Sequence, residues 1–330
     1  MKRLAMIAVL GLTALAVRRY RDARDALAAV APDLRSPLLP FISETRHAWL
    51  LPLFRLNARI PTRSGPGVIV TERHVGQPAV RVMITTPAGG QAPRPGVLWI
   101  HGGGYVVGSP QLEAFATAHL ARDLNVVTVS PDYRLAPVHP FPAALDDCMA
   151  VLRWMRSNAE ELGIDPTRVA VMGASAGGGL SAAVAQRSHD EGIPLRAQVL
   201  AYPMLDDRTV LRLDHEGRGR FMWTPASNRL GWSSYLGREP RMSDAPQYAA
   251  PARRTDLTGL APAWVGVGEL DLFYDEDVAY AQALKDSGVD TTLVIVAGMY
   301  HGADAIRRKS LSMKDFRASM HNHLRTYLAQ

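Results

Sequence analysis

The chain is poor in cysteine. Among its 330 residues only Cys148 carries a thiol, which excludes an internal disulfide and any metal site built from several cysteines. Cys148 lies at helical spacing with Leu145, Leu152 and Met155, a pattern typical of one apolar helix face. We therefore expect it to be a core residue.

A basic stripe is also missing. The formal net charge is +6, but the arginines and lysines are dispersed and are not interleaved with aromatic residues. Nucleic acid is therefore not an expected partner. The sequence also lacks an internal repeat of about 20–50 residues, which excludes a solenoid or a propeller.

No apolar run is long enough to span a bilayer. Leu4–Val17 is uncharged and apolar, but it is shorter than the roughly 20 residues that a spanning helix needs. Lys2 and Arg3 before it, with an A-x-A pattern near its end, resemble a secretory signal peptide. The basic cluster that follows favours a cytoplasmic protein whose uncleaved residues 1–17 associate with a membrane. Secretion, or a helix that forms part of a cap, is the alternative.

Apolar residues make up 47% of the chain and gather in short runs separated by helical patterns. The runs predict strands at Val68–Val75, Val80–Thr85, Val97–Ile100, Val126–Val129, Val169–Met172, Ala197–Ala201, Ala263–Val267 and Thr291–Val296. Helices are expected over 112–120, 143–158 and 275–287 and from about Leu311. This alternation predicts an α/β fold with a mostly parallel sheet covered by helices on both faces.

Two segments break the alternation. Prolines at 32, 37, 40 and 52 divide residues 18–59 into short helical pieces, which we expect to cover another part of the protein. Residues 205–248 carry few strand signals, many arginines and several aromatic residues. This second segment is expected to be an inserted lid.

The most informative stretch is Val169–Ser181, with the sequence VAVMGASAGGGLS. A strand pattern leads into G-x-S-x-G at 173–177, and helix-compatible residues follow, as in a nucleophile elbow. Glycines are needed at both ends because a Cβ there would crowd the strand and the helix. The pattern predicts that the Ser175 hydroxyl stands clear of the sheet as a nucleophile.

Three glycines, at 102–104, directly follow His101 and the strand predicted at Val97–Ile100. Consecutive glycines let backbone N–H groups converge on one point, which in acyl transfer is the oxyanion of the tetrahedral intermediate. Phosphate binding is the alternative, but neither G-x-G-x-x-G nor a Walker loop is present. We therefore predict an oxyanion-binding loop.

A serine nucleophile also needs a base and an acid, which in this arrangement follow it in the order acid, then histidine. His301 comes just after the last predicted strand and is the expected base. Glu269 and Asp271 follow the strand Ala263–Val267, and both remain candidates for the acid on spacing alone. The acids at 275–277 are explained by the first turn of a helix. The other histidines are expected at the surface, in packing or in the glycine loop: His47, His74, His101, His119, His139, His189, His215, His321 and His323.

Taken together, these motifs closely resemble the hormone-sensitive-lipase-like branch of the α/β-hydrolases, also called bacterial esterase family IV. The resemblance extends from about Val68 to the C-terminus and includes HGGG at 101–104, DYRLAP at 132–137, the elbow, GELD at 268–271 and GMYHG at 298–302. It implies that Asp271 is the triad acid and that Gly103, Gly104 and Ala176 form the oxyanion hole. It also implies a cap built from residues 1–60 and about 205–248, over a catalytic domain at 61–330.

Three positions depart from the family pattern. Ala174 replaces the usual aspartate of the elbow, Val138 replaces a glutamate after LAP, and Ala303 replaces a frequent aromatic residue. None of these positions supplies a catalytic group. They affect the expected rigidity of the loops and the shape of the pocket.

The sequence thus predicts a serine carboxylesterase that hydrolyses short- to medium-chain esters with Ser175, His301 and Asp271. No metal or organic cofactor is expected, and the partners are a small ester substrate and, as a hypothesis, a second copy of the chain. Tyr105, Trp223 and Trp232 are candidates for the pocket wall, with core packing as the equal alternative. Lactones, acetylated aryl groups or amides remain alternative substrates, and a non-catalytic ligand receptor is the alternative outside enzymes.

Overall fold

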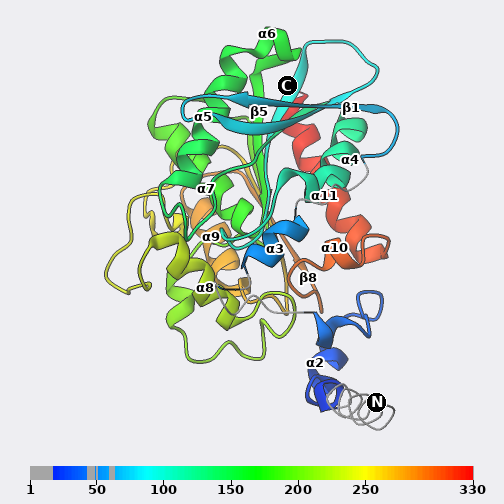
Figure 1. Cartoon of the computed structure of the whole chain (residues 1–330), viewed down its shortest axis with the longest axis vertical. Coiled ribbons are helices and arrows are strands. Elements are labelled where there is room, and N and C mark those ends of the chain that lie inside the picture. The colour runs from blue at the N-terminus through cyan, green and yellow to red at the C-terminus, as the bar shows by residue number, and fades with distance from the viewer. Residues whose placement is uncertain (1–17, 43–48, 50, 59–63, 330) are drawn as a thin grey trace, which may run out of the picture.

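The computed structural model describes residues 18–42, 49, 51–58 and 64–329. One eight-stranded sheet runs through the molecule in the order β1-β2-β4-β3-β5-β6-β7-β8 (Figure 1). Its strands are β1 (Val68–Val75), β2 (Val80–Pro87), β3 (Arg94–Ile100), β4 (Val127–Pro131), β5 (Ile164–Ala174), β6 (Ala197–Ala201), β7 (Ala263–Gly268) and β8 (Thr291–Val296). Strand β2 is antiparallel to both of its neighbours, and all pairs from β4 to β8 are parallel.

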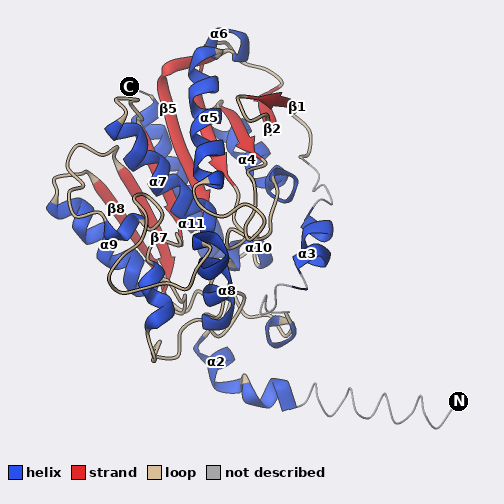
Figure 2. Cartoon of the chain, turned by 60° about the vertical axis from the view of Figure 1, so that its left-hand side comes forward, coloured by secondary structure: helices blue, strands red, loops and turns tan. Residues whose placement is uncertain are grey.

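Helices connect the strands and flank the sheet (Figure 2). They are α2 (Arg24–Ala29), α3 (Leu51–Ala58), α4 (Ala114–Leu124), α5 (Ala143–Ser157), α6 (Ala159–Leu162), α7 (Ala176–Asp190), α8 (Pro225–Leu236), α9 (Tyr274–Asp286), α10 (Ala303–Ile306) and α11 (Leu311–Leu328). Short 3-10 turns are η1 (Leu39–Phe41), η3 (Pro110–Glu113), η4 (Asp207–Leu211) and η5 (Pro251–Arg253). The predicted fold, a mostly parallel sheet between helices, is confirmed.

The central strands bury both faces, as expected for strands that read as continuous apolar runs. Successive side chains of a strand point to opposite faces. In β3, Leu98 and Ile100 accordingly join the core that includes α5 and α7, whereas Val97 and Trp99 join the core that includes α4 and α11. Cys148, on α5, is fully buried in the core that includes α5 and α7, as predicted.

Residues 205–248 contain η4 and α8 and no strand. Helix α8 lies toward the same end of the molecule as α2 in both views (Figures 1 and 2). The segment is tied to α9, because the Glu276 side chain accepts hydrogen bonds from the backbone amides of Leu205 and Asp206, at 2.8 and 3.1 Å.

The N-terminal segment contacts the loops at the ends of the sheet. The Ala31 amide donates to the Gly298 carbonyl, and the Tyr300 hydroxyl donates to the Leu34 carbonyl, at 3.1 and 3.3 Å. From α3, Arg55 donates to the carbonyl of Val106, beyond the glycine loop, at 2.9 Å. The segment therefore packs on loops that carry predicted site residues.

No helix within the described ranges is both long and apolar enough to cross a membrane. Residues 1–17, on which the membrane prediction rests, lie outside these ranges.

The three acids in the first turn of α9 have different environments. Asp275 forms ion pairs with Arg212 and Arg218, at 2.6 and 3.0 Å. Asp277 is fully buried, and neither of its carboxylate oxygens has a hydrogen-bond partner among the described residues. Burial, followed by the charges of Glu276 and Asp271, raises the pKa of Asp277 well above its ordinary value. Folding therefore favours the protonated form of Asp277, which the sequence pattern did not indicate.

We predict that Asp277→Asn stabilises the protein increasingly as the pH rises. A raised folded-state pKa makes the acid favourable to stability only at low pH, and this contribution is lost as the pH rises toward the folded pKa. The gain of the variant over the wild type should grow by up to about 1.4 kcal/mol per pH unit above the unfolded pKa. Urea denaturation at pH 5 and pH 8 measures it.

Asp275→Asn is the matched control, since it removes a carboxylate from the same helical turn that is already paired with arginines. It should give no such gain. A difference between Asp277→Asn and the wild type that stays constant between the two pH values would mean that Asp277 is ionised in the folded protein.

Candidate active site

Ser175 occupies the sharp turn between β5 and α7 and has a positive φ of 57°, with ψ of −124°. Few residues other than glycine adopt such angles, and the strain fixes the side chain at the turn. Gly173 and Gly177 make the turn sterically feasible: a Cβ on Gly173 would collide with the Gly177 backbone, and a Cβ on Gly177 with the Ile100 carbonyl. The local pattern therefore folds as the motif requires.

His301 joins Ser175 to Asp271. The Ser175 Oγ atom lies 2.9 Å from His301 Nε2, and His301 Nδ1 lies 2.8 Å from Asp271 Oδ2. The serine comes from the turn after β5, the acid from the loop after β7 and the histidine from the loop after β8. Since the strands are parallel, these three loops leave the same edge of the sheet. All three side chains are buried, and Asp271 has no solvent exposure.

The geometry distinguishes the two acids that spacing left open. Asp271 is held by the Phe273 amide, which donates to its Oδ1 atom at 3.0 Å, while Oδ2 faces His301. Glu269 is exposed and accepts a hydrogen bond from the Gly298 amide at 3.1 Å. The structure therefore brings Asp271 to the histidine and leaves Glu269 outside the site.

Aromatic side chains surround the His301 ring. Tyr202 and Phe273 approach it edge-on, with ring centroids at 4.9 and 5.3 Å. These contacts restrict the ring orientation and limit access of water. Neither residue was singled out from the sequence, although Phe273 lies two positions after Asp271.

The glycine loop after β3 lies against the serine turn. Gly103 and Gly104 have φ values of 121° and 60°, which other residues rarely adopt. A Cβ on Gly102 would come within 2.9 Å of the Ala174 carbonyl oxygen and 3.5 Å of the Ser175 Cβ. Among the described residues, no group accepts a hydrogen bond from the amides of Gly103, Gly104 or Ala176. These three N–H groups are therefore available to a ligand.

His101, the residue before the three glycines, helps to fix the position of this loop. Its ring stacks on Tyr133, with centroids 4.1 Å apart, and the Tyr133 hydroxyl donates to the His101 carbonyl at 2.9 Å. Burial lowers the pKa of His101 to about 4, so the ring is neutral at pH 7. Arg134, next to Tyr133, donates to the buried Asp147 from its backbone amide at 2.9 Å and from its guanidinium group at 2.8–3.1 Å. The DYRLAP motif thus anchors the glycine loop, a role that its sequence alone did not reveal.

The three candidate pocket residues have different surroundings. Trp223 packs against Gly104, and its ring centroid lies 6.2 Å from that of His301. Tyr105 stacks on Tyr235 and donates to the Met204 carbonyl at 3.1 Å, and Trp232 lies fully buried beside it. Core packing therefore accounts for Tyr105 and Trp232, and Trp223 is the candidate that borders the site.

Two of the three departures from the family pattern have clear surroundings. Val138 is 66% exposed, so no buried partner depends on an acid at that position. Ala303 is fully buried behind the histidine loop, in the same core as Tyr300.

Comparison with known proteins agrees with the fold. Residues 97–305 match a family model described as the alpha/beta hydrolase fold. Carboxylesterase NlhH of Mycobacterium tuberculosis is 36% identical over 260 residues, covering 74% of this chain and 78% of that protein. Ethyl acetate hydrolase of Pseudomonas putida is 34% identical, covering 62% of this chain and 64% of that protein.

Among solved structures, a bacterial heroin esterase superposes with a TM-score of 0.83 at 33% identity, over 92% of this chain and 99% of that one. The match of the family model spans more than half of the chain, and the NlhH match covers 74% of it. The chain therefore belongs to the α/β-hydrolase family, in the hormone-sensitive-lipase-like branch that its motifs indicate.

Proposed function

We propose that this protein is a serine carboxylesterase in which Ser175, His301 and Asp271 form the catalytic triad. The observation that carries the proposal is the pair of short contacts on the two ring nitrogens of His301, at 2.9 Å to Ser175 and 2.8 Å to Asp271. A nucleophile, a base and an orienting acid joined in this way are the requirements for acyl transfer. The esterase names of the relatives support the same conclusion.

In the acylation step, Ser175 Oγ attacks the ester carbonyl carbon as His301 Nε2 accepts its proton. Asp271 holds the Nδ1–H tautomer and stabilises the imidazolium ion that forms. The carbonyl oxygen becomes an oxyanion, to which the amides of Gly103, Gly104 and Ala176 donate. Collapse of this intermediate breaks the bond to the alcohol, which leaves with the proton from His301.

Deacylation repeats these roles with water as the nucleophile. His301 Nε2 accepts a proton from the water as it attacks the acyl-enzyme carbonyl. The same three amides stabilise the second oxyanion, and His301 returns the proton to Ser175 Oγ as the carboxylic acid leaves. The reaction as written needs only protein groups, ester and water.

We further propose that the acyl group is short to medium in length. Trp223 packs directly against Gly104, one of the proposed oxyanion donors, and its indole is held by Asn228, which accepts from Nε1 at 3.2 Å. A fixed indole at this position limits the space next to the carbonyl carbon. We also propose residues 1–60 and about 205–248 as the cap over this pocket, with a catalytic domain at 61–330. The described parts of both segments contact loops of the site.

The location of the protein is part of the same proposal. We propose that residues 1–17 hold it at the cytoplasmic side of a membrane, because the apolar run is flanked by basic residues on both sides. Fractionation of cells that express the chain with and without residues 1–17 would test this. The hypothesis of a homodimer is tested by the mass of the purified protein in solution.

A series of esters of increasing acyl length tests the reaction and the pocket together. Hydrolysis of p-nitrophenyl esters from acetate to palmitate should peak at short acyl chains, because Trp223 restricts the acyl side of the pocket. Ser175→Ala should lower kcat by roughly four to six orders of magnitude, since it removes the nucleophile. Its melting temperature should stay close to that of the wild type or rise.

A wild type as slow as Ser175→Ala on every ester would contradict the esterase proposal. In that case p-nitroacetanilide and a lactone series would decide between the amidase and lactonase alternatives and a receptor. A maximum at palmitate would contradict only the proposed pocket size.

Substitution of each acid in turn distinguishes the role of Asp271 from that of Glu269. Asp271→Asn should lower kcat by about four orders of magnitude with little change in KM, because the amide favours the wrong imidazole tautomer. Glu269→Gln is the matched control: it removes a carboxylate two residues away that does not contact His301, and kcat should change by less than about threefold. Steady-state kinetics with p-nitrophenyl acetate measure both. Equal losses in the two variants would contradict the assignment of Asp271.

A further inference from the structure

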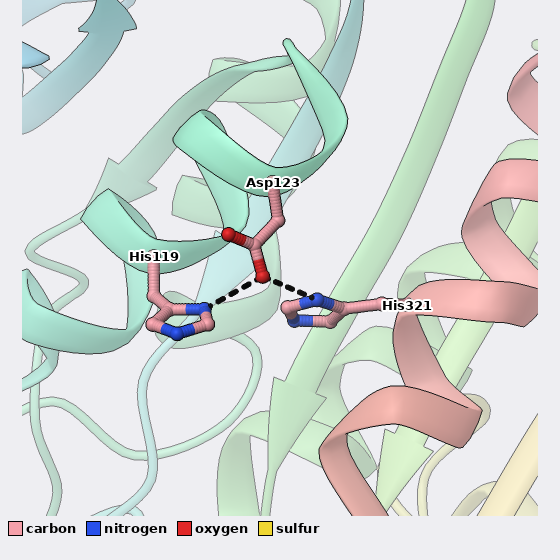
Figure 3. Close-up of side chains that lie close together, drawn as sticks. All are labelled: His119, Asp123 and His321. Carbon is pink, nitrogen blue, oxygen red and sulfur yellow. Dashed lines mark ion pairs between the residues drawn. The ribbon is translucent and has the colours of Figure 1, made fainter. Parts of the chain in front are cut away.

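Three side chains converge on one another at the surface between α4 and α11 (Figure 3). His119 and Asp123 come from α4, and His321 comes from α11. The Asp123 Oδ2 atom lies 2.9 Å from His119 Nδ1 and 3.2 Å from His321 Nδ1. One possible ligand atom from each of the three residues lies within 4.8 Å of the other two. None of the three residues belongs to the proposed catalytic machinery.

The backbone holds this cluster in place. His119 and Asp123 are four residues apart on one helix, so their side chains share a face. Leu120 of the same helix and Met320 and Leu324 of α11 are buried in one core, which fixes the two helices against the sheet. Donors carried by packed helices keep their relative positions, as a metal site requires.

The contact between His119 and Asp123 is not an ordinary hydrogen bond. His119 Nδ1 is shielded from solvent and forms no hydrogen bond with any described residue, although the carboxylate oxygen is only 2.9 Å away. The pair therefore has the length but not the direction of a hydrogen bond. Shielded polar atoms normally have hydrogen-bond partners, and His119 Nδ1 has no aligned one among the described residues.

We propose that His119, Asp123 and His321 form a binding site for a divalent transition-metal ion of the zinc type. Zinc bonds to nitrogen and oxygen are about 2.0–2.1 Å long, which sets the donors of a tetrahedral site about 3.3 Å apart. The observed separations of 2.9 and 3.2 Å need only a small adjustment to reach this value. Two imidazoles and one carboxylate suit zinc, nickel, cobalt or copper rather than magnesium or calcium.

The surroundings fit a site with open coordination positions. His119 and Asp123 are 40% and 38% exposed at the side chain, so water can complete the coordination of a bound ion. Arg317 interacts electrostatically with Asp123 and with His321, and its positive charge weakens the attraction for a cation. We therefore expect the site to bind the metal ion with modest affinity.

Such an ion would tie the C-terminal helix to α4. It binds only when the two helices are packed together, so it stabilises the folded chain by mass action. No reaction step is assigned to it, and ester hydrolysis is expected to be the same with and without the metal.

The test is a titration of tag-free, chelator-treated full-length protein with Zn²⁺ in a calorimeter. The wild type should bind one equivalent and show a higher melting temperature with Zn²⁺ than without it. His119→Ala and Asp123→Asn should each weaken binding by about tenfold or more. His139→Ala is the matched control, because it removes an exposed histidine outside the cluster and should leave binding unchanged.

Asp123→His supplies a third imidazole, at the same helical spacing from His119, and keeps three donors. It should bind Zn²⁺ at least as tightly as the wild type, which a purely structural ion pair would not explain. Binding that is equal in the wild type, His119→Ala and Asp123→Asn would overturn the proposal, as would loss of binding in Asp123→His. Hydrolysis of p-nitrophenyl acetate, measured in parallel, reports on the catalytic site separately.

Discussion

The backbone at Ser175 is the constraint on which the site depends. A residue with a side chain and a positive φ costs of the order of 1–3 kcal/mol, which must be offset by its surroundings. Here the Ser175 amide donates to the Ala201 carbonyl at 2.9 Å, and the Ser175 carbonyl accepts from the amides of Gly179 and Met204, each at 3.0 Å. The turn is therefore fixed by a neighbouring strand, by its own helix and by the segment that follows β6.

The other loops of the site pack around this fixed turn. The glycine loop can approach Ser175 only because no Cβ intervenes at Gly102, and Gly177 lets α7 pass close beneath the same loop. His301 reaches the serine from the edge of the sheet, with its orientation set by Asp271 on one side and aromatic rings around it. The site is thus assembled from four separate segments, each of which follows the carboxyl end of a parallel strand.

The residues with local signals could be predicted from the sequence, and those that depend on long-range packing could not. Apolar runs predicted all eight strands, and short motifs with glycine singled out the turn at Ser175 and the loop after β3 that lies against it. Spacing alone left Glu269 and Asp271 open, because which one reaches His301 depends on how the loop after β7 turns. The role of Tyr133, the burial of Asp277 and the approach of His321 to His119 arise from contacts between distant segments, which leave no periodic pattern in the sequence.

The central claim is that His301 and Asp271 activate Ser175 as a nucleophile. The most direct measurement is the reaction of the folded wild type with diethyl p-nitrophenyl phosphate, followed by mass spectrometry of its peptides. The serine oxygen should displace p-nitrophenolate and carry one diethylphosphoryl group, at Ser175 and at no other serine, with complete loss of esterase activity. Labelling elsewhere with loss of activity, or full activity after Ser175 is labelled, would contradict the account.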